Sequence, residues 1–330
     1  MNVLFVCSGN SEYYEISSFI KSQADALIEK GIQVEFFVIK GKGVVNYGRN
    51  VFYLKNILRR NRYQIIHAHY SLSGWVAVLA IPGIPIVLSL MGTDALGKFV
   101  GRNKINFGSW IYVTLTYLIQ PFVRAIISKS SEIEDVVYRK KVSYVIPNGV
   151  QLNKFVGSGP GFRSELGLEK EMKYVLFLAN PIDVNKNYEL AKAAVQRLGR
   201  KDVTLINIFK ESPDTVVKYL NSVDVFVSCS FSEGSSNAIK EAMACNCPMV
   251  VTNAGDAEWI IGDTPGCFVS SYDPSIFAND LGRALDFAGE HRRTNGRRRI
   301  CELGLDSETV VEKIVGIYKK LLLKKRLLIL

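Results

Sequence analysis

The chain has 330 residues, of which 48% are hydrophobic and 22% are charged. This length allows two domains that each bury a core, and the composition excludes a disordered or low-complexity protein. The net charge is +10, and residues 291–330 contribute 11 Lys and Arg against 4 Asp and Glu. A basic tail suits an anionic membrane surface or a solvated helix face. It argues less for nucleic acid, because its basic residues alternate with Leu and Ile and no nucleic-acid-binding motif accompanies them.

Short runs rich in Val and Ile alternate with amphipathic helical segments through the first half of the chain. In the helical segment 17–30, Ser17 or Ser18 can cap the start and Gly31 can end the helix. Continuous apolar strands that alternate with helices predict a parallel sheet covered on both faces. The predicted strands are Val3–Cys7, Val34–Ile39, Ile65–Ala68, Ile86–Ser89, Ala125–Ser128 and Ser143–Ile146.

The longest apolar stretch, residues 107–123, is interrupted by Gln120 and Pro121. It is shorter than the roughly 20 residues that a membrane-spanning helix needs, so we expect a buried helix there. The apolar segment Met1–Cys7 lacks a basic region before it and is interpreted as a first strand, not a secretory signal. The six cysteines are expected to be reduced core residues, and Cys245 with Cys247 lacks a second pair that would complete a metal site.

The alternation pauses between residues 150 and 170, where the Gly- and Pro-containing segment 157–161 predicts a linker. The pattern then resumes, which predicts an α/β protein with two Rossmann-like domains facing each other across a cleft. We expect an N-terminal domain over residues 1–155, a C-terminal domain over 156–305 and a basic C-terminal helix over 306–330. The second set of predicted strands is Tyr174–Leu178, Val203–Ile206, Val225–Ser228 and Met249–Val251, with helices starting near Asn187, Pro213 and Ser236.

A Ser/Gly-rich turn follows the predicted strand that ends at Ser228, and a helix begins near Ser236. The free N–H groups and the positive dipole end of such a helix suit a phosphate. Gly234 allows the backbone to approach a ligand closely. Glu233 and Glu241 are eight residues apart and can contact the two ends of a nucleotide diphosphate sugar, although glutamates at this spacing also occur by chance.

The segment Glu233–Val250 resembles the family 4 glycosyltransferases of the GT-B fold, whose signature here is E-G-x-x-N-x-x-x-E-A-M-A-x-x-x-P-V-V. Three further stretches resemble the same family in the expected order: Ile146–Phe155, Ala179–Asn187 and Val250–Glu258. The resemblance covers nearly the whole chain. It implies the GT-B architecture, a nucleotide-sugar donor held by the second domain, and sugar transfer with retention at the anomeric carbon.

The resemblance also assigns roles to residues of the second domain. Glu241 would accept hydrogen bonds from ribose hydroxyls, Glu233 would face the transferred sugar, and Lys186 would stabilise the departing diphosphate. The family usually pairs this lysine with an arginine six residues earlier, where the present chain has Asn180. The expected donor-binding residues are Asn180, Lys186, Gly234, Ser235, Ser236, Asn237 and Glu241.

The first domain is expected to supply the acceptor side. The segment Ser8–Ser11 resembles the first-strand loop of the family, and Leu90–Asp94 stands where many relatives have H-G-[ST]-D, with Met91 in place of the histidine. His69 lies past the end of a strand, where it can face a ligand or be a structural histidine, and Asp94 can also serve only as a turn cap. The expected acceptor-side residues are Gly9, Asn10 and Gly92, and the expected catalytic residues are Glu233, Lys186, Asp94 and His69.

The chain contains no D-x-D sequence, so we expect neither a metal ion nor a cofactor, with positive side chains and a helix dipole replacing the cation. The expected function is transfer of a sugar from a UDP- or GDP-type donor to a glycan or lipid-linked glycan in cell-surface polysaccharide synthesis. We expect a cytoplasmic protein whose basic tail contacts the inner membrane face. Two alternatives are a non-catalytic nucleotide-sugar-binding partner of a glycan-assembly complex and a GT-B-fold nucleotide-sugar epimerase. An NAD dehydrogenase is disfavoured, because no G-x-G-x-x-G follows the first strand.

Overall fold

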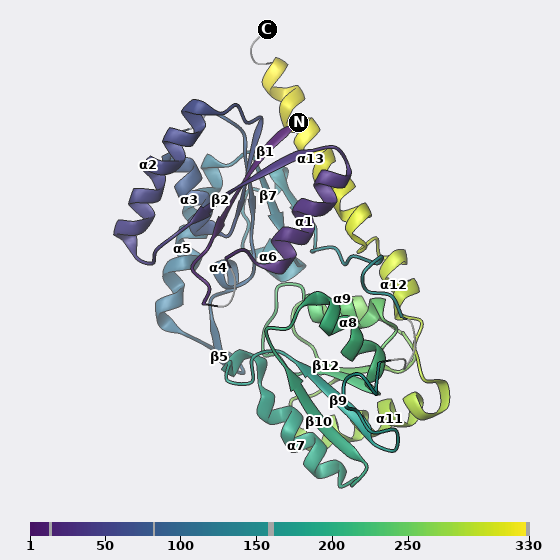
Figure 1. The fold of residues 1–330 in the computed structure, drawn as a ribbon. Helices are drawn as coiled ribbons and strands as arrows, with labels where there is room; N and C mark the ends of the chain where they lie inside the picture. Colours follow the sequence, from purple (N-terminus) through teal and green to yellow (C-terminus); the bar gives the residue numbers. More distant parts are fainter. Residues whose placement is uncertain (13–14, 82, 158–161, 328–330) are drawn as a thin grey trace. The chain divides into compact units, whose positions relative to one another are not determined.

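The computed structural model describes residues 1–12, 15–81, 83–157 and 162–327, so most of the predicted linker, residues 158–161, lies outside the described residues. Contacts divide the chain into two compact units (Figure 1). Unit 1 contains Met1–Lys98, Asn106–Gly149 and the chain from Ser307 onward, and unit 2 contains Phe99–Ile105 and Val150–Asp306. This division places the C-terminal helix with the first domain, and it ends that domain at Gly149 where the sequence suggested residue 155.

Unit 1 is built on a six-stranded parallel sheet in the order β2-β1-β3-β4-β7-β8. The central strands are buried along almost their whole length, as expected for apolar strands covered on both faces. In this register Phe5 of β1 pairs with His67 of β3, and His67 pairs with Val87 of β4. The strands are β1 (Asn2–Ser8), β2 (Gln33–Ile39), β3 (Ile65–His69), β4 (Ile86–Ser89), β7 (Ala125–Ser128) and β8 (Ser143–Val145).

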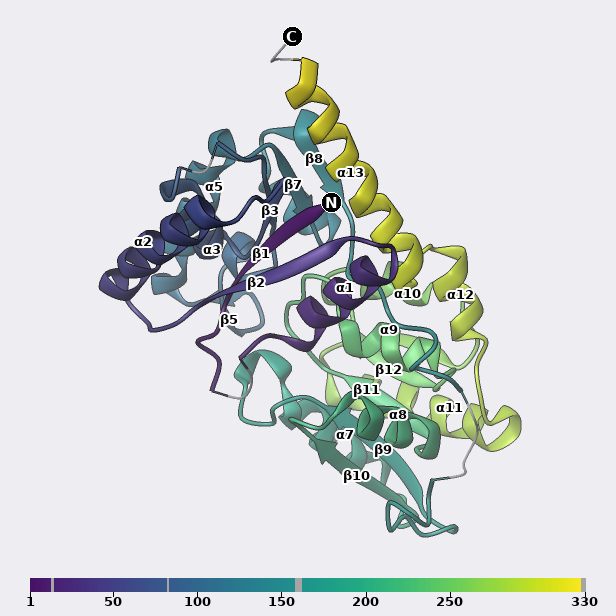
Figure 2. The same ribbon diagram turned by 45° about the horizontal axis from the view of Figure 1, so that its top comes forward.

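Helices cover the two faces of this sheet (Figures 1 and 2). One core joins the sheet to α1 and α13, and a second core joins it to α2, α3 and α5. Tyr318 of α13 lies fully buried in the first of these cores, so the C-terminal helix packs back on the first unit. The helices are α1 (Ser18–Glu29), α2 (Val44–Arg60), α3 (Ser71–Leu79), α4 (Thr93–Leu96), α5 (Trp110–Ile119), α6 (Ser131–Asp135) and α13 (Ser307–Leu327), with short 3-10 turns η1 (Phe107–Ser109), η2 (Gln120–Phe122) and η3 (Lys140–Val142).

The helix expected within residues 107–123 is confirmed, but the expectation that it is buried is wrong. The segment forms α5 with a 3-10 turn at each end, but Trp110 is 51% exposed and Ile111 60% exposed. Its apolar residues run all around the helix, whereas Thr116 and Ile119 on one side are the helix residues that reach the interior. Among the described residues, no helix is long and apolar enough to cross a membrane.

A two-stranded antiparallel hairpin, β5 (Phe99–Gly101) and β6 (Lys104–Ile105), comes from the first half of the chain but belongs to unit 2. It lies against the turn η4 (Val184–Lys186). The guanidinium of Arg102 at its tip lies 5.1 Å from the ring centre of Tyr272, a cation–π distance. The alternation of strands and helices in the sequence did not predict that residues 99–105 belong to unit 2.

Unit 2 has a five-stranded parallel sheet in the order β10-β9-β11-β12-β13. One core joins the sheet to α7 and α11, and the other joins it to α8, α9, α10 and α12. The predicted strands and helix starts of both units are confirmed to within two residues. The elements are β9 (Lys173–Leu178), α7 (Tyr188–Leu198), β10 (Val203–Ile208), α8 (Pro213–Ser222), β11 (Val225–Ser228), α9 (Asn237–Ala244), β12 (Met249–Thr252), α10 (Ala257–Ile261), β13 (Cys267–Ser270), α11 (Pro274–His291) and α12 (Gly296–Glu302).

The cysteines are all free, as the sequence suggested, and five of them are buried. Cys301 is the exception, because it lies on an exposed position of α12. Within the described ranges, no group of three or more His, Cys, Asp or Glu side chains is arranged to hold a metal ion.

Candidate donor-binding site

The candidate site of unit 2 lies where β9 and β11 end and α9 begins. The buried strand β11 ends at Ser228, and the turn that follows leads to Ser236, whose Oγ accepts a hydrogen bond from the Ile239 N–H. Ser236 is therefore the N-cap, and this confirms the helix start expected from the sequence. The turn delivers free N–H groups and the positive end of the α9 dipole to the same edge of the sheet.

Lys186 and Glu233 form an ion pair at this edge. Lys186 Nζ lies 2.5 Å from Glu233 Oε1, and the Ser230 hydroxyl donates to the same oxygen at 2.7 Å. The lysine and glutamate side chains are 30% and 17% exposed, so water screens their interaction less than that of a surface pair. Both line a small cavity of about 20 Å³ together with Ser236, which indicates that the lysine, the glutamate and the α9 start face one space.

Asn185 connects the loop that carries Lys186 (the lysine loop) to the turn that carries Glu233 (the glutamate turn). Its Nδ2 donates to the Ser232 carbonyl at 2.9 Å, and its Oδ1 accepts from the Ser232 N–H at 3.2 Å. The Asn185 carbonyl also accepts from the Phe231 N–H at 2.9 Å. These three hydrogen bonds hold Lys186 beside Glu233, so Asn185 is a positioning residue that the sequence analysis missed.

Gly255, in the turn between β12 and α10, approaches the same glutamate. Its φ is +63°, and a Cβ built there would lie 2.5 Å from the Glu233 carbonyl oxygen. Glycine is required because both the backbone conformation and this close contact exclude a side chain. The turn is part of the family-like stretch Val250–Glu258, so the resemblance there corresponds to a definite packing constraint on the site.

Lys240 is a second cation of the site that sequence reasoning missed. It is 1% exposed, and its Nζ donates to the Ser235 hydroxyl at 2.9 Å. Burial lowers the pKa of Lys240 to about 8, opposed by the carboxylates of Asp256, Glu241 and Glu233. A lysine in the first turn of a helix reads as a solvated residue in sequence, and only the packing of the turn against α10 shows otherwise.

The half-buried Glu241 and the buried Asp256 share the charge of Lys240. Burial raises the pKa of Glu241 to about 7, and Lys240 acts in the opposite direction. Burial likewise raises the pKa of Asp256, and Lys240 again opposes the shift. Lys240 thus favours the ionised form of both carboxyl groups.

The remaining predicted donor residues lie on the same two loops or at the start of α9. Asn180 follows β9, and its Oδ1 accepts from the Ile182 N–H at 3.2 Å, which caps a turn. Gly234 is buried in the glutamate turn, and Asn237 is the first residue of α9. The structure therefore brings Lys186, Glu233, Ser235 and Ser236 together and ties Asn180 to its own loop.

The predicted acceptor-side loop of unit 1 is fixed to the end of β2. The Asn10 amide donates to the Gly41 carbonyl at 3.0 Å, and the Gly9 N–H donates to the Ile39 carbonyl at 2.9 Å. A Cβ at Gly9 would lie 2.4 Å from a methyl of Val38, so a close approach of backbone to side chain accounts for the glycine.

Asp94 is fully buried in unit 1 and accepts hydrogen bonds from three backbone groups. The N–H of Ser71 donates at 2.9 Å, and those of Met91 and Gly92 donate at 2.9 and 3.1 Å. Burial raises the pKa of Asp94 to about 6, and these hydrogen bonds oppose the shift. The geometry is that of a loop cap, the alternative that the sequence had left open, and it also fixes the backbone of Gly92.

His69 and His67 are stacked in the core of unit 1, with ring centres 4.4 Å apart. The Tyr318 hydroxyl lies 2.5 Å from His67 Nδ1, and Ser89 Oγ lies 2.8 Å from His67 Nε2. His69 is 2% exposed, and within the described part of the chain its ring nitrogens have no hydrogen-bond partner. Burial lowers the pKa of both rings well below the ordinary value, so both are neutral at pH 7.

These buried rings make a prediction for acid stability. Unfolded histidine takes up a proton as the pH falls below about 6.5 but the buried rings do not, so stability present above that pH is lost below it. The effect is at most about 1.4 kcal/mol per pH unit for each ring. The raised pKa of Asp94 has the opposite effect on the pH dependence of stability, so a variant must be compared with the wild type.

We expect urea unfolding between pH 6.5 and 5 to show a smaller loss of stability for His69→Leu than for the wild type. His291→Leu, at an exposed position, is the control and should leave the pH dependence unchanged. Equal slopes of stability against pH for the wild type and His69→Leu would contradict the assignment of His69 as a buried, neutral ring.

Comparison with known proteins decides the family. Residues 22–154 match the family model described as Glycosyltransferase Family 4, and residues 168–286 match the one described as Glycosyl transferases group 1. The chain belongs to the family 4 glycosyltransferases. The gap between the two matches, residues 155–167, lies in the segment between β8 and β9, so the first match covers most of unit 1 of this family 4 chain and the second covers most of unit 2.

Curated relatives of this family 4 chain are distant in sequence. The putative teichuronic acid biosynthesis glycosyltransferase TuaC of Bacillus subtilis is 24% identical over 239 residues, which is 63% of this chain and 58% of that protein. An Escherichia coli UDP-Gal:alpha-D-GlcNAc-diphosphoundecaprenol alpha-1,3-galactosyltransferase is 23% identical, with 84% of this chain and 80% of that protein covered. The match to the Bacillus protein thus spans somewhat more than half of its length.

Solved structures share the fold. Sucrose-phosphate synthase from Thermosynechococcus elongatus aligns with a TM-score of 0.79 and 17% identity, covering 97% of this chain and 98% of that one. The Anabaena protein HepE, in complex with UDP and glucose, aligns with a TM-score of 0.71 and 15% identity over 97% of this chain and 100% of that one. These alignments confirm the predicted α/β fold, two Rossmann-like units of the GT-B type.

Proposed function

We propose that this family 4 chain is a retaining glycosyltransferase that moves a sugar from a UDP- or GDP-type donor to a glycan or lipid-linked glycan in cell-surface polysaccharide synthesis. The observation that carries the proposal is the Lys186–Glu233 pair at the N-terminal end of α9. The names of the Bacillus and Escherichia coli relatives, and the UDP bound by the Anabaena protein, support the donor and acceptor classes.

In the proposed reaction the donor diphosphate lies at the α9 N-terminus and takes Lys186 Nζ as a partner in place of Glu233. The bond between the anomeric carbon and the phosphate oxygen breaks, and the acceptor oxygen bonds to that carbon from the same face. The departing phosphate receives the acceptor proton. Lys186 and the helix dipole stabilise the charge that develops on the diphosphate, so the scheme assigns no role to a metal ion or cofactor.

Glu241 and Glu233 would hold the two ends of the donor. An ionised Glu241 accepts hydrogen bonds from ribose hydroxyls, and Glu233, released from Lys186, faces the sugar hydroxyls. On the acceptor side, the loops around Asn10 and Gly92 would contact the acceptor. Asp94 supports that side by fixing its loop, because its oxygens are occupied by backbone N–H groups.

A donor panel tests the proposal. A ligand that binds the native state raises its unfolding temperature, and a concentration one hundred times the dissociation constant adds about 2.7 kcal/mol. We expect one UDP- or GDP-sugar to raise the unfolding temperature, and the same sugar to release nucleoside diphosphate faster when the acceptor is added. The absence of a shift with every UDP- and GDP-sugar would contradict the proposal.

A second candidate function is favoured by Met91 and Asn180, which stand where the family resemblance leads one to expect histidine and arginine. The chain would then be a non-catalytic nucleotide-sugar-binding partner of a glycan-assembly complex. In the donor panel this candidate gives a thermal shift without release of nucleoside diphosphate. An epimerase would instead return an altered sugar without any acceptor.

We also propose a peripheral location on the cytoplasmic face of a membrane, where lipid-linked acceptors would be reached. The basic tail was the first candidate for the contact, but the side chains of residues 325–327 and all of residues 328–330 lie outside the described residues.

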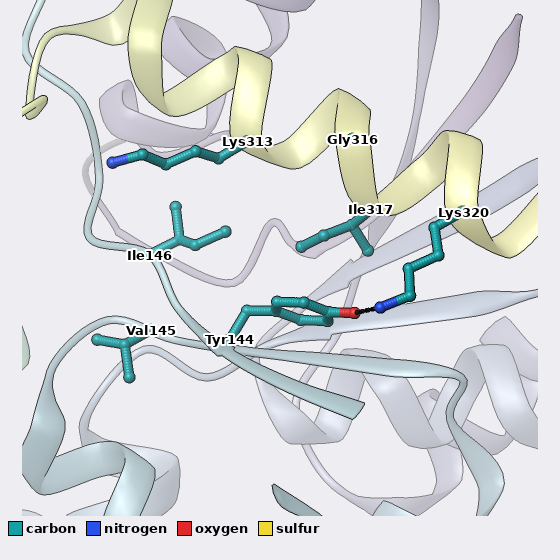
Figure 3. A pocket seen from close by; sticks show the side chains of 7 residues that line it. All are labelled: Tyr144, Val145, Ile146, Lys313, Gly316, Ile317 and Lys320. Carbon is teal, nitrogen blue, oxygen red and sulfur yellow. Dashed lines mark hydrogen bonds between the residues drawn. The ribbon is translucent and has the colours of Figure 1, made fainter. Parts of the chain in front are cut away.

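The described part of α13 forms a groove of about 390 Å³ with β8 (Figure 3). Ile146 and Ile317 line its floor, and Lys313 and Lys320 stand at its rim, with Lys320 Nζ 3.3 Å from the Tyr144 hydroxyl.

A further inference from the structure

A second concentration of positive charge lies in unit 1, away from the basic tail. Residues 36–98 and 106–131, which both belong to unit 1, contain ten Lys and Arg residues and a single acidic residue, Asp94. Asp94 and Lys129 are buried, so the surface formed by these segments carries nine basic side chains and no acidic one. The net charge of these segments, +9, exceeds the +7 of residues 291–330.

Helix α2 presents much of this charge beside exposed apolar side chains. Its 17 residues include four basic and no acidic residues, and within the described ranges no ion pair is found for Arg49, Lys55, Arg59 or Arg60. On the same helix Val44 is 90% exposed, and the rings of Phe52 and Tyr53 are 71% and 60% exposed. A soluble helix that packs on a core normally exposes polar residues on its outer face, so this composition requires another explanation.

Helix α5 and its flanking turns continue the apolar character without any charge. Phe107 is 88% exposed, Trp110 51% and Ile111 60%. At the other end of the helix, Leu118 and Phe122 are more than half exposed as well. This is the segment that the sequence had led us to expect in the core.

The helices α2, α3 and α5 form one face of unit 1. Helix α3 packs against both α2 and α5, and Leu79 at its end is 55% exposed. Both ribbon views show these three helices on one side of the sheet and α13 on the other (Figures 1 and 2). We define the aromatic–basic face as the exposed residues of α2, α3, α5 and the turns η1 and η2 that flank α5. This face and the basic helix α13 are therefore separate surfaces.

We propose that the aromatic–basic face docks on an anionic lipid membrane. Exposed Trp, Phe and Leu side chains would enter the boundary between headgroups and acyl chains, while Arg and Lys bind lipid phosphates. A second copy of the chain fits poorly, since the same surface would bring like charges together without an acidic partner. The inference goes beyond the proposed sugar transfer, and it moves the membrane contact from α13 to the opposite side of unit 1.

Co-sedimentation with vesicles tests the proposal. The full chain should pellet with vesicles of phosphatidylcholine and phosphatidylglycerol and stay in solution with phosphatidylcholine alone. Arg59→Gln/Arg60→Gln and, separately, Trp110→Ser/Ile111→Ser should each weaken binding at least about ten-fold. The matched control is Lys319→Gln/Lys324→Gln on α13, which removes the same charge as the arginine pair and should leave binding nearly unchanged.

Trp110 also reports directly on the contact. In a Trp75→Phe/Trp259→Phe background, fluorescence of Trp110 should be quenched by brominated acyl chains in anionic vesicles. Trp110 is 51% exposed, so its replacement removes few core contacts, and the unfolding temperatures of all variants show whether they are folded. Donor-induced thermal shifts measured on the same variants should stay as in the wild type, so that failure of the docking proposal is distinguished from failure of the proposed function.

Three results would overturn the proposal. The first is no binding to anionic vesicles, and the second is binding that the α13 control abolishes while the α2 and α5 variants retain it. The third is vesicle binding without quenching of Trp110. In the first case, tight binding of a nucleic acid would show that the charge serves a different partner.

Discussion

Lys186→Ala is expected to lower kcat/KM for sugar transfer by about 10²- to 10³-fold, the usual effect of removing one group that stabilises developing charge. Lys186 Nζ is 2.5 Å from Glu233 Oε1 beside the α9 N-terminus, so it is the cation placed where the diphosphate would depart. Because the negative charge on the diphosphate increases in the transition state, the loss should appear mainly in kcat. Steady-state release of nucleoside diphosphate measures it.

Two controls define this prediction. Lys186→Arg keeps the charge and should recover part of the activity, whereas Lys192→Ala on α7 removes a lysine paired with Glu189 on the helix surface and should have no effect. Unfolding temperatures show whether the variants are folded. Full activity of a folded Lys186→Ala enzyme would remove Lys186 from the proposed mechanism.

Lys240→Met is expected to weaken donor binding near neutral pH by about ten-fold or more. This is the usual effect of losing a hydrogen bond to a charged group, here the one between a ribose hydroxyl and the ionised Glu241. The buried ammonium opposes the upward pKa shifts of Glu241 and Asp256, so its removal raises both pKa values further. Glu241, whose pKa is about 7 with Lys240 present, would then be protonated at neutral pH and accept ribose hydrogen bonds poorly.

The sign of the pH effect separates this role from a merely structural one. Donor affinity should fall as the pH decreases through the pKa of Glu241, and in Lys240→Met the fall should begin at a higher pH. Calorimetric titration with donor between pH 6 and 9 measures the affinity of the wild type and of Lys240→Met across this change. Lys192→Met makes the same chemical change at a surface position and should follow the wild-type profile. A uniform loss of affinity at every pH would show that Lys240 acts only through packing.

The sequence predicted the framework of the donor site well, because its signals are local. Strand β11, the Ser/Gly-rich turn and the start of α9 follow from apolar runs, glycine and a capping serine within one short segment. The roles of Glu233 and Lys186 came from the resemblance, and the structure adds the ion pair between them and the Asn185 hydrogen bonds. Asn185 had no sequence signal, since an asparagine beside a lysine is common in any loop.

By itself, the sequence determined the alternation of strands and helices, the two α/β units and the family, since these depend on short-range periodicity and contiguous motifs. Tertiary structure alone decided how much of each side chain is buried. It put α5 at the surface, Lys240 in the interior, Asp94 under three backbone N–H groups and His69 in the core. Burial and charge pairing depend on which segments distant in sequence pack together, and a hydrophobic pattern does not specify these partners. The hairpin that carries Arg102 into unit 2 could not be predicted for the same reason. Its neighbours, η4 and Tyr272, lie more than 80 residues after Arg102 in the chain.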